Sequence, residues 1–69
     1  MGYEINWVAR EGDATFFQSP YYQKYNNVKF GDITASDVKA DIKLCLAQNE
    51  SAAIVSYLSW ILRVLALVA

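Results

Sequence analysis

The chain has few side chains that could carry out covalent or acid–base chemistry. Its 69 residues include no histidine and one cysteine, Cys45. Histidine is the side chain that most often transfers protons near neutral pH, and without it Cys45 has no partner to activate it as a nucleophile. One cysteine without histidine also cannot assemble a zinc site or an internal disulfide. We expect Cys45 to be a small buried apolar residue, with lipid attachment as the alternative.

The acidic residues do not form a recognisable metal site, because their spacing is not that of a calcium-binding loop. Asp37 and Asp41 lie one helical turn apart, which is typical of a solvated helix face. The seven acids are Glu4, Glu11, Asp13, Asp32, Asp37, Asp41 and Glu50. We therefore predict no enzymatic activity, no cofactor, no metal and no small-molecule substrate. The net charge of −1 and the scattered basic residues argue against nucleic-acid binding.

Two sets of residues remain as candidate interaction sites. In the C-terminal segment, Ser56, Ser59 and Arg63 follow an i, i+3, i+7 spacing, and alanines extend the same stripe. Small residues let helices approach closely, so we predict a helix-docking seam. The seam is Ala52, Ser56, Ser59, Arg63 and Ala66. Aromatic residues gather near the N-terminus, where they indicate either a miniature core or a partner-binding surface. The predicted partner surface is Trp7, Phe16, Phe17, Tyr21, Tyr22, Tyr25 and Phe30.

The elements that would position these residues indicate a small α+β chain with an aromatic-rich region at 1–34. Alternation over residues 3–10 predicts a strand, Glu11-Gly12-Asp13 a turn, and residues 14–18 the return strand of a β-hairpin. Ser19-Pro20 breaks this pattern, and residues 28–30 are a candidate third strand of a short three-stranded sheet.

Two helices are expected after this region. Thr34 followed by Asp37 marks the start of an amphipathic helix at 35–48, with apolar residues at Val38, Ile42, Cys45 and Leu46. A long apolar helix is expected at 51–69. The intervening Asn49-Glu50-Ser51 contains no strong helix breaker, so the sequence leaves open whether these are two helices or one.

The apolar segment 51–69 has three interpretations. Fifteen of its nineteen residues are apolar, and a helix of this length would be roughly 28 Å long, close to the thickness of a bilayer core. We therefore expect a single C-terminal transmembrane helix, with Arg63 paired or reaching the near end of the helix. The alternatives are burial in an oligomer or partner, and a monomer core in which Ser56, Ser59 and Arg63 face water.

These features together predict a non-enzymatic accessory or structural subunit. It would be held in a membrane with its bulk on the cytoplasmic side, and it would dock on a larger protein through the apolar helix and the aromatic surface. The alternative is a cytoplasmic, self-associating interaction protein, such as a small inhibitor or regulator. In that case the C-terminal helix is buried in a homo-oligomer or a target.

Overall fold

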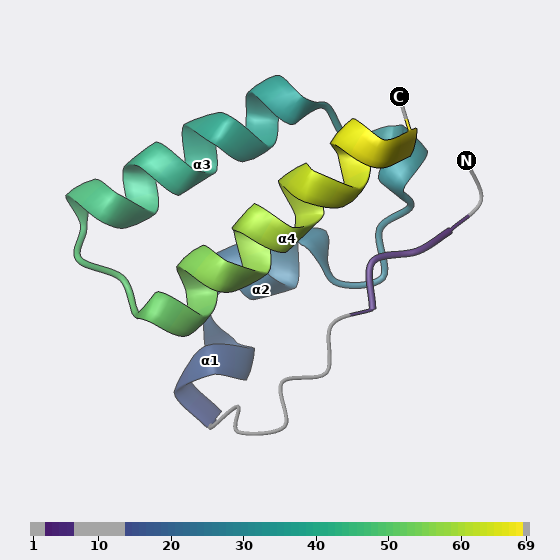
Figure 1. Cartoon of the computed structure of the whole chain (residues 1–69). Coiled ribbons are helices and arrows are strands. Elements are labelled where there is room, and N and C mark those ends of the chain that lie inside the picture. The colour runs from purple at the N-terminus through teal and green to yellow at the C-terminus, as the bar shows by residue number, and fades with distance from the viewer. Residues whose placement is uncertain (1–2, 7–13, 69) are drawn as a thin grey trace.

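The chain folds into short helices followed by a helical hairpin. The computed structural model describes residues 3–6 and 14–68. In chain order the elements are α1 (Ala14–Gln18), α2 (Pro20–Tyr25), the 3₁₀ turn η1 (Phe30–Asp32), α3 (Ala35–Ala47) and α4 (Ala52–Val68) (Figure 1). Because these residues contain four α-helices and no strand, the predicted α+β class and its three-stranded sheet are wrong.

The predicted β-hairpin does not form, because residues 14–18 are helix α1 instead of a return strand. The remainder of the first strand and its turn, residues 7–13, lie outside the described part of the chain. Phe16 is buried, and its ring lies 5.9 Å from the ring of Tyr57 in α4 in an edge-on arrangement. The β propensity of two adjacent phenylalanines is weak evidence in a five-residue window, and burial against α4 outweighs it.

Helix α2 begins at the point where the sequence indicated only a break. The Ser19 side-chain oxygen accepts a hydrogen bond from the Tyr21 N–H at 3.3 Å, and Pro20 occupies the first helical turn. The missing N–H of proline is harmless there, since the first N–H groups of a helix have no intrahelical acceptor. The Ser-Pro pair is therefore a helix start.

A tight turn after α2 brings the chain back to the N-terminal segment. Asn26 has φ −63° and ψ 127°, and Asn27 has φ 64°, as in a type II turn. The Ile5 N–H then donates to the Val28 carbonyl at 2.8 Å, and the Asn27 N–H donates to the Ile5 carbonyl at 3.0 Å. This pairing amounts to one isolated antiparallel bridge. The candidate third strand at 28–30 therefore contacts the N-terminus without becoming a strand.

Helix α3 matches the range of the predicted amphipathic helix, and its start is the one the sequence indicates. The Thr34 hydroxyl oxygen accepts a hydrogen bond from the Asp37 N–H at 3.2 Å. This contact satisfies one of the N–H groups that the first turn of a helix leaves without a partner.

A left-handed residue separates α3 from α4 and settles that they are two helices. Asn49 has φ 56°. The Glu50 N–H donates to the Cys45 carbonyl at 3.0 Å, and the Asn49 N–H donates to the Leu46 carbonyl at 3.3 Å. These two hydrogen bonds are the pattern of a Schellman motif, which satisfies the last carbonyls of α3 and reverses the chain.

The helices form two layers. Helices α3 and α4 run antiparallel and share the largest interface of the fold, and α4 lies in front of α2 in Figure 1. The molecule is only 16 Å across its shortest axis, which leaves room for two layers of helices. The core between them consists of Ile5, Phe16, Tyr25, Phe30, Val38, Cys45, Ile54, Tyr57, Leu58 and Ile61.

The apolar C-terminal segment is helical but does not have the properties of a membrane span. Helix α4 is 17 residues long, and one of its faces is buried against the core. Within residues 3–6 and 14–68, no helix combines the length and apolarity needed to cross a membrane. The predicted single transmembrane helix and the membrane localisation are therefore wrong.

Candidate functional site

The aromatic residues predicted to form a partner surface lie mainly within the fold. The rings of Phe16 and Tyr22 are 5.0 Å apart, and the Phe30 ring lies 5.8 Å from that of Trp60 in α4. Among the seven, Phe16, Tyr25 and Phe30 are buried, Tyr21 and Tyr22 are half-buried, Phe17 is 38% exposed, and Trp7 lies outside the described residues. The group mostly attaches α1, α2 and η1 to α4, and little of its surface faces outward.

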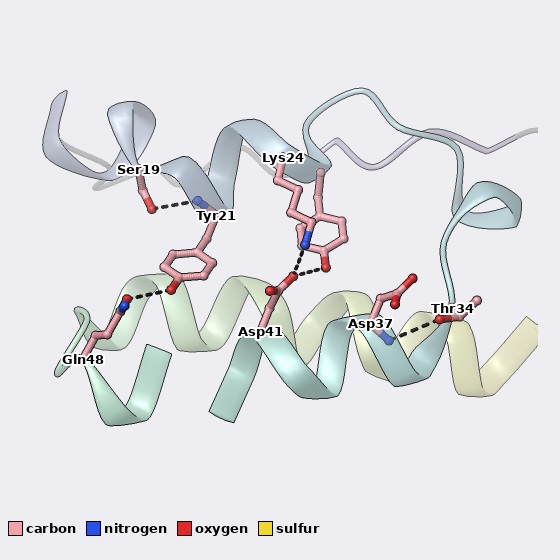
Figure 2. A network of polar contacts seen from close by, with 8 residues as sticks. Ser19, Tyr21, Lys24, Thr34, Asp37, Asp41 and Gln48 are labelled. Carbon is pink, nitrogen blue, oxygen red and sulfur yellow. Dashed lines mark hydrogen bonds and ion pairs between the residues drawn. The ribbon is translucent and has the colours of Figure 1, made fainter. Parts of the chain in front are cut away.

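A small polar network connects α2 with α3 (Figure 2). The Tyr25 hydroxyl donates a hydrogen bond to Oδ2 of Asp41, and the Lys24 ammonium group lies 2.8 Å from the same oxygen. Asp41 is 9% exposed. The network satisfies a nearly buried carboxylate, which would otherwise destabilise the fold.

This network is built to hold helices together. Burial of the Tyr25 hydroxyl, together with its hydrogen bond to Asp41 and the charge of that carboxylate, raises the pKa of Tyr25. A phenol that keeps its proton so firmly is poorly suited to acid–base catalysis near neutral pH. Across the part of the chain that the structure describes, no three His, Cys, Asp or Glu side chains are grouped to hold a metal ion.

Further contacts of α2 complete its attachment to the hairpin. The Tyr21 hydroxyl donates to Oε1 of Gln48 at 2.7 Å (Figure 2), and the Tyr57 hydroxyl donates to the Tyr22 carbonyl at 3.2 Å. Cys45 is fully buried, which confirms the prediction of a small core residue, and burial raises the pKa of its thiol. Helix α2 therefore covers one flank of both α3 and α4.

The predicted helix-docking seam lies on the outer side of α4. At 100° per residue it is opposite the buried positions Ile54, Leu58 and Ile61. Ala52, Ser56, Arg63 and Ala66 are exposed and Ser59 is half-buried. The described chain brings no other element against this seam, so its docking role stays a prediction.

The uncovered flank of α3 is defined by the contacts of its other flank. Asp41 and Gln48 bond to side chains of α2, so the flank that carries them faces that layer. Residues about 100° to 160° from Asp41 round the helix axis turn away from α2. This far flank carries Lys39, Ile42 and Leu46, and Leu46 is 61% exposed.

The same argument places the uncovered flank of α4. Tyr57 contacts Tyr22, and Trp60 contacts Phe30, so their flank faces the covering layer. The flank turned away from that layer carries Val55 and Leu62, both half-buried, with Ser59 and Ala66 at its edge. Helices α3 and α4 pack against each other as an antiparallel pair (Figure 1), so their uncovered flanks are neighbours. We call the strip formed by Ile42, Leu46, Val55 and Leu62 the open face.

The open face was not predicted from the sequence, although the sequence contains a signal for it. Ile42 and Leu46 belong to the apolar stripe of the first predicted helix, and the second predicted helix is apolar around most of its circumference. Two such helices in a chain this short present more apolar surface than a thin second layer can cover. Leu46 is the clearest instance, since the stripe placed it with Val38 and Cys45, which are fully buried.

Comparison with known proteins gives no relative from which a role could be transferred. No protein-family model, no curated protein sequence and no solved structure matches this chain.

Proposed function

We propose that this chain is a small, non-enzymatic protein-binding module that docks a helix of a larger partner protein on the open face of its α3–α4 hairpin. One observation carries the proposal. Apolar side chains of two adjacent helices lie on the flanks that turn away from α2, where Ile42, Val55 and Leu62 stay half-buried at the edge of the core. Among them, Leu46 exposes 61% of its surface.

The partner's helix would complete a packing arrangement that the chain begins. Two antiparallel helices side by side accept a third helix along the line between them, with interaxial distances of about 8–10 Å. An amphipathic helix binding through residues at i, i+3, i+4 and i+7 is a recurring mode of protein recognition. Because a 69-residue domain buries little surface by itself, such a partner would also stabilise it.

The two sets of residues singled out in the sequence take different parts in this proposal. Ser59 and Ala66 of the seam border the open face, where short side chains leave space for a partner helix. The aromatic residues instead hold α1 and α2 against the side of the hairpin opposite the open face. The proposal therefore assigns docking to the hairpin and scaffolding to the aromatic cluster.

Photo-crosslinking in the cells that produce the protein tests this proposal. A photoreactive amino acid replaces Leu46 on the open face, or Leu67, which is 80% exposed on another side of α4. We expect one discrete heavier adduct from position 46 and none from position 67. The adduct's partner is then purified, and its affinity is measured for the wild type, Leu46→Asp and Leu67→Asp.

The two aspartate variants decide the result. Both replace an exposed leucine, so both should fold, which circular dichroism checks. We expect Leu46→Asp to weaken binding at least about tenfold and Leu67→Asp to leave it unchanged. Equal losses in both variants, or adducts at both positions, would show that the open face is not the docking surface.

A further inference from the structure

We infer that the partner helix is acidic, with an apolar stripe bordered on both sides by Asp or Glu. This inference rests on the proposed function and adds the chemistry of the partner. It starts from the basic residues that border the open face, which we call the basic rim. Lys39 and Lys43 lie along the α3 edge and Arg63 lies along the α4 edge, all three exposed.

The charges of the hairpin are separated between its two sides. Asp41 contacts α2, and Asp37 shares its flank of α3. The Glu50 N–H donates to the Cys45 carbonyl at 3.0 Å, which places Glu50 at the end of α3 where Tyr21 of α2 bonds to Gln48. Helix α4 contains no acidic residue. The acidic residues of the hairpin are therefore on the α2 side or close to it, and the side that carries the open face is basic.

Among the described residues, no carboxylate forms an ion pair with the basic rim. The ion pair that the fold does contain joins Lys24 to Asp41 on the side of α3 that faces α2. A partner carboxylate at the edge of an apolar contact would gain attraction to the rim without being fully buried. Such peripheral charges mainly speed association and select the partner. The apolar strip would provide affinity, and the rim would choose an acidic helix over a basic one.

A second copy of this chain is a poor occupant of the open face. In a two-fold symmetric dimer each face meets the same face of its partner. Two basic rims would then lie against each other, and like charges at an interface oppose association. The net charge of −1 does not reveal this separation, because the acidic residues of α3 lie on the side that faces α2.

Designed peptides test the inference with the full-length protein. The first is an amphipathic helix of about 18 residues, or ~27 Å, with a leucine stripe bordered by Glu on both sides. The second replaces every flanking Glu with Lys, and the third scrambles the first. Fluorescence anisotropy measures binding at about 50 mM and about 500 mM salt, since higher salt screens exposed charges. Backbone NMR shifts locate the contact.

We expect the acidic peptide to bind at least about tenfold more tightly than the basic peptide, and to lose about tenfold in affinity at high salt. Shifts should concentrate on Ile42, Leu46, Val55 and Leu62. Lys39→Glu combined with Arg63→Glu should remove the preference for the acidic peptide. The matched control, Lys29→Glu, reverses an exposed charge outside the hairpin and should leave binding unchanged.

The other outcomes separate this inference from the proposed function. If both peptides bind the open face equally, the docking surface stands and the acidic partner is wrong. If neither peptide binds while crosslinking at position 46 yields a partner, the acidic helix is again wrong. A dimer in sedimentation experiments that Leu46→Asp dissociates would make a second copy the occupant. Equal binding to anionic lipid vesicles would show that the rim senses only negative charge. Either result overturns the inference.

Discussion

Asp41 is the residue on which the polar contacts between α2 and α3 converge. Its Oδ2 accepts hydrogen bonds from the Tyr25 hydroxyl and the Lys24 ammonium group, and these two donors differ in how far they are exposed to solvent. The Lys24 side chain is 55% exposed, whereas Tyr25 is buried. The two contacts should therefore contribute unequally to stability, because solvent screens an exposed ion pair.

Replacement of each partner separates these contributions. We expect Asp41→Ala to lower the free energy of unfolding by about 2–3 kcal/mol, since it leaves the buried Tyr25 hydroxyl without an acceptor. Lys24→Ala should cost less than about 1 kcal/mol. Urea unfolding followed by circular dichroism measures both. Equal losses in the two variants would mean that the ion pair, not the tyrosine hydrogen bond, stabilises the contact.

Buried tyrosines should make the fold sensitive to alkaline pH. Burial raises the pKa of Tyr25, helped by Asp41, and burial also raises the pKa of Tyr57. In the unfolded chain these phenols ionise near their ordinary pKa of 10.0. The folded state holds the protons more tightly, so this stabilisation is complete below pH 10 and is lost as pH rises above it.

Urea midpoints measured between about pH 7 and pH 11 test this sensitivity. We expect a constant midpoint up to about pH 9 and a steep decline above pH 10. Tyr25→Phe should be less stable at neutral pH and should decline less steeply, because one of the coupled protons is gone. If the variant and the wild type decline in parallel, Tyr25 does not contribute to the alkaline transition.

At the scale of elements, the junction between α3 and α4 determines how the hairpin closes. Asn49 adopts φ 56°, a conformation that costs a residue with a β-carbon about 1–2 kcal/mol and costs glycine little. Asparagine tolerates it better than most residues. We expect Asn49→Gly to leave stability unchanged or raise it slightly, and Asn49→Val to lower it by about 1–2 kcal/mol. Thermal unfolding compares them.

Asn49 is exposed and its side chain is not part of the core. The two variants therefore differ mainly in the cost of the left-handed backbone conformation. A loss of similar size in both variants would instead point to a contact of the Asn49 side chain. The same pair of substitutions at Asn27, where φ is 64°, repeats the test in the turn after α2.

The elements also show what local sequence could predict. Helix α3 was predicted within one residue at its C-terminal end, because Thr34 caps it and its apolar stripe is regular. The predicted return strand at 14–18 is wrong because a local pattern over a few residues competes with contacts far along the chain. Phe16 becomes helical and packs on Tyr57, 41 residues later in the sequence. Local pattern carries no information about that contact.

The candidate site could be predicted only in part, for a related reason. The polarity pattern of α4 correctly separates its outer seam from its buried face. It does not show which flank α2 covers, because that depends on contacts such as the one from Tyr21 to Gln48. The open face is defined by this coverage, so its position follows from tertiary structure.

At the scale of the whole molecule, the thiol of Cys45 lies between the two layers. It is fully buried in the core shared by α3, α4 and α2. Its reactivity therefore reports how often the layers separate. A two-layer domain of this size has a net stability of only about 3–5 kcal/mol, so it opens often enough to be followed. We expect a thiol reagent to modify Cys45 about 10²–10⁴-fold more slowly in the native protein than in urea.

A variant in which the only cysteine is moved to an exposed position provides the matched control for this measurement. Leu46→Cys in a Cys45→Ala background places the thiol on the open face, where the native residue is 61% exposed, and it should react at nearly the rate of unfolded chain. Addition of the acidic peptide should slow modification at both positions. It would cover position 46 directly and would stabilise the closed state around Cys45 by mass action. Protection of Cys45 alone would mean that the peptide binds away from the open face.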